Sequence, residues 1–287
     1  MTLRVHSEIG KLSSVLVHLP GAEIDRMVPA MMEELLFDDI LFGARAREEH
    51  RRFQQVLGYV ADEVLRLSEL LRGGPRRPGA SRRRSWKTWP DPPVGHGPGR
   101  PPAGPSRRTA LASALVTGIE KPPREAAQSS SELYWLPPVP NYFFQRDPLV
   151  VVGDRVIRGS MATPARLREP LLSGYIFQYH PRFARRTAVV LVPRVLRRLR
   201  AVGFLRADAP DARGGDVIVL RSDLLAIGYS ERTEKTTIER LAEALKAARS
   251  PVKRIFVVAI PPARSTMHLD TVFTDDLSGT SAWSTAR

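Results

Sequence analysis

The order strand, strand, helix, strand over residues 216–260 constrains the fold of this chain more than any other feature. Apolar runs at 216–220 and 224–228 predict two strands joined by a short polar turn. Residues 236–248 predict an amphipathic helix, and residues 255–260 predict a strand that two prolines end. An order of this kind is typical of the α/β class of folds.

The helix is supported by its cap and by its apolar stripe. Thr236 and Glu239 have the spacing of a capping box at its start. The stripe that we expect to be buried consists of Ile238, Leu241, Ala242 and Leu245. A single ββαβ unit cannot cover its own sheet, so we expect an assembly of related units.

Other regular elements are expected earlier in the chain. Residues 13–19 predict a strand, and a helix is expected to begin near Ala44, with Gly58 as a candidate for an early end. Residues 64–67 fit either a strand or a helix. Residues 149–157 predict a β-hairpin.

Two basic segments account for the net charge of +14. Residues 72–124 contain 12 basic and 2 acidic residues, and residues 182–213 contain 9 and 2, so the remainder is mildly acidic. The first segment also contains 11 Pro and 8 Gly, which predicts disorder with a short helix near 109–116. In the second segment, residues 189–192 fit a strand and residues 194–200 a basic helix.

This charge pattern argues against sequence-specific recognition of nucleic acid. Trp86 and Trp89 are the only aromatic residues near the first segment's charges, so few bases could stack. Nonspecific binding of polyanions remains an alternative function. The glycine-rich residues 95–99 follow no strand and precede no helix, so they do not predict a phosphate loop.

The chain is expected to be cytoplasmic. No apolar run approaches the roughly 20 residues that span a bilayer, and the N-terminus lacks the regions of a signal peptide. The absence of cysteine excludes disulfides and thiolate metal sites within these 287 residues. His6, His18, His50, His96 and His180 show no spacing typical of metal ligands. We expect no membrane partner, and a homo-oligomer is allowed but not predicted.

His268 and Asp270 form the most suggestive polar pair. On a strand they would point to the same face, where an imidazole beside a carboxylate handles protons. Such a pair is also compatible with a structural role on a buried strand. It usually serves a nucleophile, and the sequence contains no thiol to fill that position.

The polar residues of three segments match a guanidinium substrate. The segments are 141–148, 214–216 with 230–233, and 267–270. A guanidinium is planar, stays charged and donates from a fork of N–H groups, so Asp147 and Asp270 could hold it from two edges. Arg166 and Arg232 could bind the carboxylate of an amino-acid substrate, and His268 could move protons.

These segments resemble arginine deiminase. The resemblance covers about residues 1–71, 132–182 and 214–274. It rests on the following motifs: Val5-His6-Ser7-Glu8-Ile9-Gly10-Lys11-Leu12, Leu35-Leu36-Phe37-Asp38-Asp39-Ile40, Leu136-Pro137-Pro138-Val139-Pro140-Asn141 through Asp147-Pro148, Tyr175-Ile176-Phe177, His180-Pro181, Gly214-Gly215-Asp216, Ile227-Gly228, Ser230-Glu231-Arg232-Thr233 and Met267–Thr274.

The resemblance implies a pentein fold, a five-fold pseudosymmetric propeller of ββαβ units. It implies hydrolysis of L-arginine to L-citrulline and ammonia in arginine catabolism, through a cysteine thiolate and without metal or cofactor. The catalytic residues that it implies are Asp147, His268 and Asp270. The substrate-binding residues that it implies are Asn141, Phe144, Arg166, Asp216 and Arg232.

Two departures from the family pattern bear on activity. Arg213 stands where the family has a catalytic glutamate, and at roughly 5 Å with a dielectric near 20 like charges repel by about 3 kcal/mol. The segment with the nucleophilic cysteine is absent. Losing a nucleophile costs on the order of 10⁶ in rate, so we expect the chain as given to be inactive. A non-catalytic arginine-binding protein is the alternative.

Residues 72–124, residues 182–213 and the tail after Thr274 share an abrupt change to Arg-, Pro-, Gly- and Ala-rich sequence. We hypothesise a gene with a disrupted reading frame, which leaves the propeller incomplete at its C-terminus. The expected organisation is an N-terminal part of the catalytic domain (1–71), a basic insertion (72–131) and the remainder of the domain (132–287). Sequencing the source locus tests this hypothesis.

Overall fold

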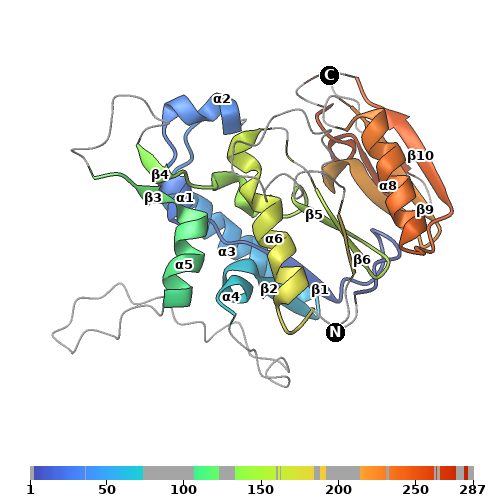
Figure 1. Ribbon diagram of the computed structural model, residues 1–287, viewed down its shortest axis with the longest axis horizontal. Helices are drawn as coiled ribbons and strands as arrows, with labels where there is room; N and C mark the ends of the chain where they lie inside the picture. Colours follow the sequence, from blue (N-terminus) through green and yellow to red (C-terminus); the bar gives the residue numbers. More distant parts are fainter. Residues whose placement is uncertain are drawn as a thin grey trace. The chain divides into compact units, whose positions relative to one another are not determined.

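The computed structural model (Figure 1) describes most of the chain outside the two basic segments. The described residues are 3–35, 37–73, 107–122, 133–159, 161, 163–183, 188–191, 214–230, 233–261, 263, 266–275 and 281–283. They divide into two compact units, and the first comprises residues 1–11, 32–38 and 141–287. None of the described helices combines the length and apolar character needed to cross a bilayer.

The first unit has the α/β character that the sequence predicts. Its strands are β5 (Leu149–Val152), β6 (Arg155–Arg158), β7 (Ala188–Leu191), β8 (Val217–Arg221), β9 (Leu224–Tyr229), β10 (Arg254–Ala259), β11 (Phe273–Asp275) and β12 (Ser281–Trp283). Its α-helices are α2 (Met32–Leu35), α6 (Arg168–Tyr179) and α8 (Lys235–Ala247). Its 3-10 helices include η4 (Pro140–Phe143), η5 (Pro164–Arg166), η6 (Gly214–Asp216) and η8 (Leu269–Thr271).

The topology of this unit contains the same motif twice. Strands β8 and β9 pair antiparallel, α8 follows, and β10 pairs parallel to β9. Strands β5 and β6 pair antiparallel, α6 follows, and β7 pairs parallel to β6. The predicted ββαβ unit is therefore confirmed, and a second unit of the same connectivity supports the expectation of related units. Both predicted hairpins and the strand near residue 189 are also confirmed.

One apolar core joins the two motifs. It contains residues of β5, β6, β8, β9 and α8: Val150, Val152, Ile157, Val217, Val219, Leu225, Ile227, Ile238, Leu241 and Leu245. A second cluster lies on the other face of β8 and β9, and consists of Ile218, Ala226, Ile260, Leu269 and Phe273. The residues after β10 thus cover the second face of this sheet, which places residues 268–270 near the start of β8.

The capping-box prediction for α8 is wrong. The helix begins at Lys235, and its N-cap is Glu234, which makes no side-chain capping bond. Thr236 therefore lies inside the first turn, where its hydroxyl contacts Glu234 Oε2 at 3.4 Å instead of capping backbone amides. The buried stripe is confirmed at Ile238, Leu241 and Leu245.

The second unit comprises residues 12–31 and 39–140. Its strands are β1 (Ser14–Val17), β2 (Glu63–Arg66), β3 (Ile119–Glu120) and β4 (Tyr134–Leu136). Its helices are α1 (Ala22–Asp25), η1 (Pro29–Met31), α3 (Gly43–Val60), α4 (Leu67–Leu71) and α5 (Arg107–Thr117). Strands β1 and β2 pair in parallel, and α3 precedes β2 in the chain. The ambiguous residues 64–67 therefore begin as a strand.

Two predictions in this unit can be compared with its helices. An early end at Gly58 is wrong, because α3 continues to Val60 and stops where Ala61 adopts an extended conformation. One glycine inside a helix costs only about 1 kcal/mol relative to alanine, which is too little to end a helix of this length. The helix expected near 109–116 is confirmed as α5. The basic run 194–200 and most of the insertion 72–131 lie outside the described residues.

Candidate active site

The 3-10 turn Gly214–Asp216 at the start of β8 organises the candidate site. The Gly214 N–H donates to the carbonyl oxygen of Asp147 at 3.2 Å, and Arg146 Nε donates to the carbonyl oxygen of Gly214 at 3.0 Å. A Cβ atom on Gly214 would lie 1.9 Å from the Arg146 carbonyl oxygen. Glycine therefore allows the segment that carries Asp147 to lie directly against the turn.

The same turn also contacts the third predicted segment, 267–270. A Cβ atom on Gly215 would lie 3.0 Å from Asp270 Oδ2 and 3.1 Å from His268 Cγ. The two glycines thus bring two segments that are far apart in the sequence, 146–147 and 268–270, against one turn. The backbone of Asp147 and the side chains of His268 and Asp270 lie against this turn, which is the arrangement that the guanidinium interpretation expects.

The prediction that His268 and Asp270 share a strand is wrong, although they do share a side. His268 is extended, but Leu269–Thr271 forms the 3-10 helix η8, in which the Thr271 N–H donates to the His268 carbonyl oxygen at 3.1 Å. Leu269 is fully buried in the second apolar cluster. Burial of that leucine leaves its two polar neighbours to face Gly215.

Asp216 lies buried behind His268. Its carboxylate accepts hydrogen bonds from Thr233 Oγ1 at 2.6 Å, from the Leu269 N–H at 3.0 Å and from Ser230 Oγ at 3.3 Å. His268 Nδ1 lies 3.5 Å from Asp216 Oδ2. These contacts fix the backbone of η8 and favour one orientation of the imidazole.

The carboxyl group of Asp270 has a raised pKa. Although the residue is in contact with solvent, partial burial raises this pKa to about 6. His268 and Arg146 lower the pKa, whereas the negative charges of Asp147 and Asp216 raise it. Three carboxylates therefore influence one another here, and a cationic ligand would relieve their repulsion.

A guanidinium cation such as free arginine should bind more tightly as the pH rises through about 6, since only ionised Asp270 attracts a cation. At pH 5 the dissociation constant should be about tenfold larger than at pH 7.5. Calorimetric titrations across this range measure it, and the Asp270→Asn variant should show no such step. A step of equal size in that variant would contradict the assignment.

A rise in pH has the opposite effect on the stability of the ligand-free chain. The folded-state pKa of Asp270 lies above the unfolded value of about 3.9, so the folded chain binds more protons between these values. This group's contribution is fully present below the unfolded pKa and is lost as the pH rises through about 6. Ligand-free stability and the affinity for such a cation should therefore change in opposite directions.

Arg166 is an internal ion-pair partner of Asp147. Its Nε and Nη2 donate to the two oxygens of Glu169 at 2.9 and 2.8 Å, and Nη2 lies 2.8 Å from Asp147 Oδ2. Burial lowers the pKa of Arg166, but its bonds and charge interactions with Glu169 and Asp147 outweigh burial and raise this pKa overall. The predicted substrate ligand thus also holds Asp147 in place.

The remaining predicted residues differ in position. Asn141 is buried, and its Nδ2 donates to the Leu35 carbonyl oxygen at 2.9 Å. Among the described residues, Asn141 Oδ1 has no hydrogen-bond partner, so it is an available acceptor. Phe144 is exposed, and the centre of its ring lies 4.1 Å from the centre of the Phe143 ring. Arg232 and Arg213 lie outside the described residues.

Sequence reasoning missed several residues that support the site. Glu169 stands three positions after Arg166 in a helical segment, a spacing that predicts an ion pair. Glu8 and Thr233 lie within motifs that carry the family resemblance, yet no local spacing indicates their partners. Within the described ranges, no three His, Asp or Glu residues are arranged as metal ligands.

Comparison with known proteins identifies the family. A family model described as arginine deiminase matches residues 110–276. The chain belongs to the arginine deiminase family. It is 34% identical to the arginine deiminase of Bacillus cytotoxicus over 285 residues, which cover 95% of this chain and 66% of that protein. The arginine deiminase of Listeria welshimeri is also 34% identical, over 288 residues covering 95% of this chain and 67% of that protein.

The chain thus spans 66% of the length of the first of these arginine deiminases. A solved structure with similarity is the N-terminal domain of ArgZ, an arginine dihydrolase from the ornithine-ammonia cycle in cyanobacteria, bound to substrate. It is 15% identical, with a TM-score of 0.49, over 93% of this chain and 65% of that chain.

Proposed function

We propose that this chain carries the guanidinium-binding and proton-transferring part of an arginine deiminase. The reaction is hydrolysis of L-arginine, in which water adds at the guanidinium carbon and ammonia leaves to give L-citrulline. The observation that supports this proposal is the meeting of Asp147, His268 and Asp270 around the Gly214–Asp216 turn.

The geometry assigns different tasks to the carboxylates. Asp147 and Asp270 are the proposed ligands of the substrate guanidinium, whose positive charge offsets their mutual repulsion. His268 is the proposed proton donor to the departing nitrogen. The family resemblance implies that Asp216 contacts the substrate. Because its carboxylate lies beside His268 Nδ1 and accepts the Leu269 N–H, we propose that it also orients His268.

The amino-acid end of the substrate requires separate contacts. The available oxygen of Asn141 is a suitable acceptor for the substrate ammonium group. Arg166 and Arg232 are the proposed partners of the substrate carboxylate, and Phe144 is the proposed apolar contact of the substrate's methylene groups. Arg166 must then use N–H groups that its bonds to Glu169 leave over.

These 287 residues contain no cysteine, although the family resemblance implies a thiolate nucleophile. We therefore propose that they bind arginine without releasing citrulline. The two ββαβ motifs support a further structural proposal, that they belong to a five-fold pseudosymmetric pentein propeller.

Calorimetry with L-arginine and a citrulline assay test this function together. The unmodified chain should bind arginine at neutral pH and release no citrulline. Asp147→Asn should weaken binding about 10- to 100-fold, because it removes a charge-assisted bond worth about 1.5–3 kcal/mol.

The matched control is Asp154→Asn. Asp154 lies in the turn between β5 and β6, where its side chain is 51% exposed and pairs with the neighbouring Arg155. This variant should bind arginine as the unmodified chain does. Absence of arginine binding would refute the proposed function, and citrulline release would refute the proposed lack of turnover.

A further inference from the structure

Arg146 uses its guanidinium group within the fold. Nε donates to the Gly214 carbonyl oxygen at 3.0 Å, and Nη2 donates to the Val217 carbonyl oxygen at 2.6 Å. Nη1 and Nη2 also donate to the two carboxylate oxygens of Glu8, each at 3.0 Å. Two of these contacts join Arg146 to the turn and strand at the start of the β8–β9–α8–β10 motif, and the other two join it to Glu8.

Glu8 is itself anchored on strand β8. Its Oε1 accepts from the Val219 N–H at 3.0 Å, and its own N–H donates to the Val219 carbonyl oxygen at 3.0 Å. The fork of Arg146 thus binds a carboxylate that cannot move independently of β8. The contacts close a ring that runs from Arg146 through Glu8 and Val219 to the Gly214–Val217 segment.

This ring connects to the site at two points. Asp147 follows Arg146 directly, and its carbonyl oxygen accepts the Gly214 N–H at 3.2 Å. The positive charge of Arg146 also acts on Asp270, where it lowers the carboxyl pKa. Arg146 therefore affects both proposed guanidinium ligands, although its own donors are committed to Glu8 and to the backbone.

We propose that Arg146, held by Glu8, is a positioning residue that sets the spacing between Asp147 and the Gly214–Asp216 turn. The proposal rests on the proposed function, since the spacing matters for gripping arginine. The pair is only partly buried, with side-chain exposures of 36% for Arg146 and 28% for Glu8. Its loss should therefore affect ligand binding more than folding.

Three variants separate charge from geometry. Arg146→Lys keeps the charge but loses the fork, and Glu8→Gln keeps the shape but loses the anchoring charge. Each should weaken arginine binding about 5- to 10-fold, with a change in melting temperature of only a few degrees. The double variant should bind about as weakly as either single variant, because both break the same contact.

The pH profile distinguishes positioning from general loosening. Arg146→Gln removes the charge that favours ionised Asp270, so the midpoint of the pH dependence of binding should move upward. In Arg146→Lys that midpoint should stay near its original value even though affinity is reduced. The control is Arg254→Gln on the exposed end of β10, where the pair with Asp223 lies at 3.1 Å; it should change neither quantity.

Amide hydrogen exchange provides a test without ligand. The Gly214 N–H should exchange at least about tenfold faster in Arg146→Lys and Glu8→Gln, because its bond to Asp147 opens more often. Exchange that stays unchanged in both variants would overturn the proposal. Faster exchange in a chain that binds no arginine would keep the positioning role and refute only the proposed function. Arginine affinities within twofold of the unmodified chain in both variants would also overturn the proposal.

Discussion

Replacing Arg166 by methionine is expected to lower the free energy of unfolding by about 3–5 kcal/mol. Arg166 is 3% exposed and Glu169 is fully buried, so the substitution leaves an uncompensated carboxylate in the interior. It also removes the 2.8 Å contact with Asp147. Denaturant unfolding of the purified chain, followed by circular dichroism, measures the change.

Two further variants show whether the charge is responsible. Arg254→Met removes an arginine whose side chain is 58% exposed in its pair with Asp223, and it should cost less than about 1 kcal/mol. Arg166→Met combined with Glu169→Leu should recover part of the lost stability, because the fully buried carboxylate of Glu169 is then gone and only Asp147 loses its partner. A loss below about 1 kcal/mol for Arg166→Met alone would contradict the buried-pair account.

The Arg166–Asp147 pair also determines how arginine can bind to Asp147. Because Arg166 pairs with Asp147 in the ligand-free chain, arginine must share Asp147 with it or displace it. Sharing is favoured, since the two bonds from Arg166 to Glu169 keep its guanidinium in place. Arg166 then stays in place beside Asp147, and the guanidinium of the substrate is the second cation that Asp147 binds.

The sequence predicted the strands and helices of the first unit well, because their signals are local. Apolar runs and a helical stripe identify β8, β9, α8 and β10 with bounds close to those observed. Residues 268–270 are too few for periodicity to decide between strand and 3-10 helix. Burial of Leu269 against β8 and β9 decides it, and that contact is long-range.

The site itself was predictable only in part. The types of residue at 147, 268 and 270 point to a cationic substrate, but no spacing in the sequence shows that they meet. Their meeting depends on two glycines that let two distant segments lie against one turn. The Glu8–Arg146 pair bridges 138 positions, so neither helix nor strand periodicity could reveal it.

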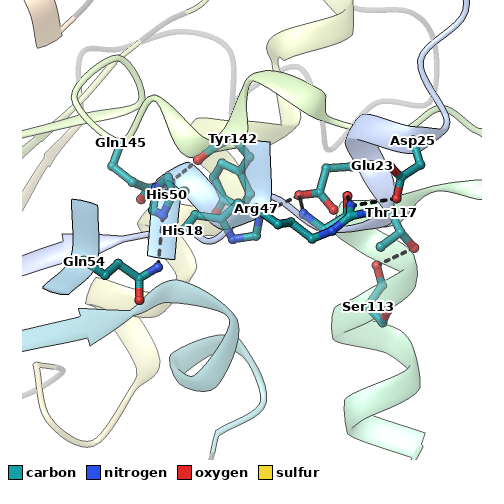
Figure 2. A network of polar contacts seen from close by, with 11 residues as sticks. His18, Glu23, Asp25, Arg47, His50, Gln54, Ser113, Thr117, Tyr142 and Gln145 are labelled. Carbon is teal, nitrogen blue, oxygen red and sulfur yellow. Dashed lines mark hydrogen bonds and ion pairs between the residues drawn. The ribbon is translucent and has the colours of Figure 1, made fainter. Parts of the chain in front are cut away.

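The second unit offers a comparable test at Glu23, and Glu23→Ala is expected to cost about 3–5 kcal/mol. Glu23 is 1% exposed and His18 is 5% exposed, and the two lie 2.9 Å apart between His18 Nε2 and Glu23 Oε1 (Figure 2). The same oxygen accepts the Gly21 N–H at 2.6 Å. Removing the carboxylate therefore leaves the buried His18 Nε2 and the partly buried Gly21 N–H without this partner at the entry to α1.

The control lies on α3 of the same unit, where Arg45 and Glu49 pair at 2.7 Å with both side chains about 60% exposed. Glu49→Ala should cost less than about 0.5 kcal/mol, because water solvates both charges after the pair is lost. Equal losses for Glu23→Ala and Glu49→Ala would show that burial of the His18–Glu23 pair contributes nothing. A large loss for Glu23→Ala alone would show that the turn from β1 into α1 depends on one buried carboxylate.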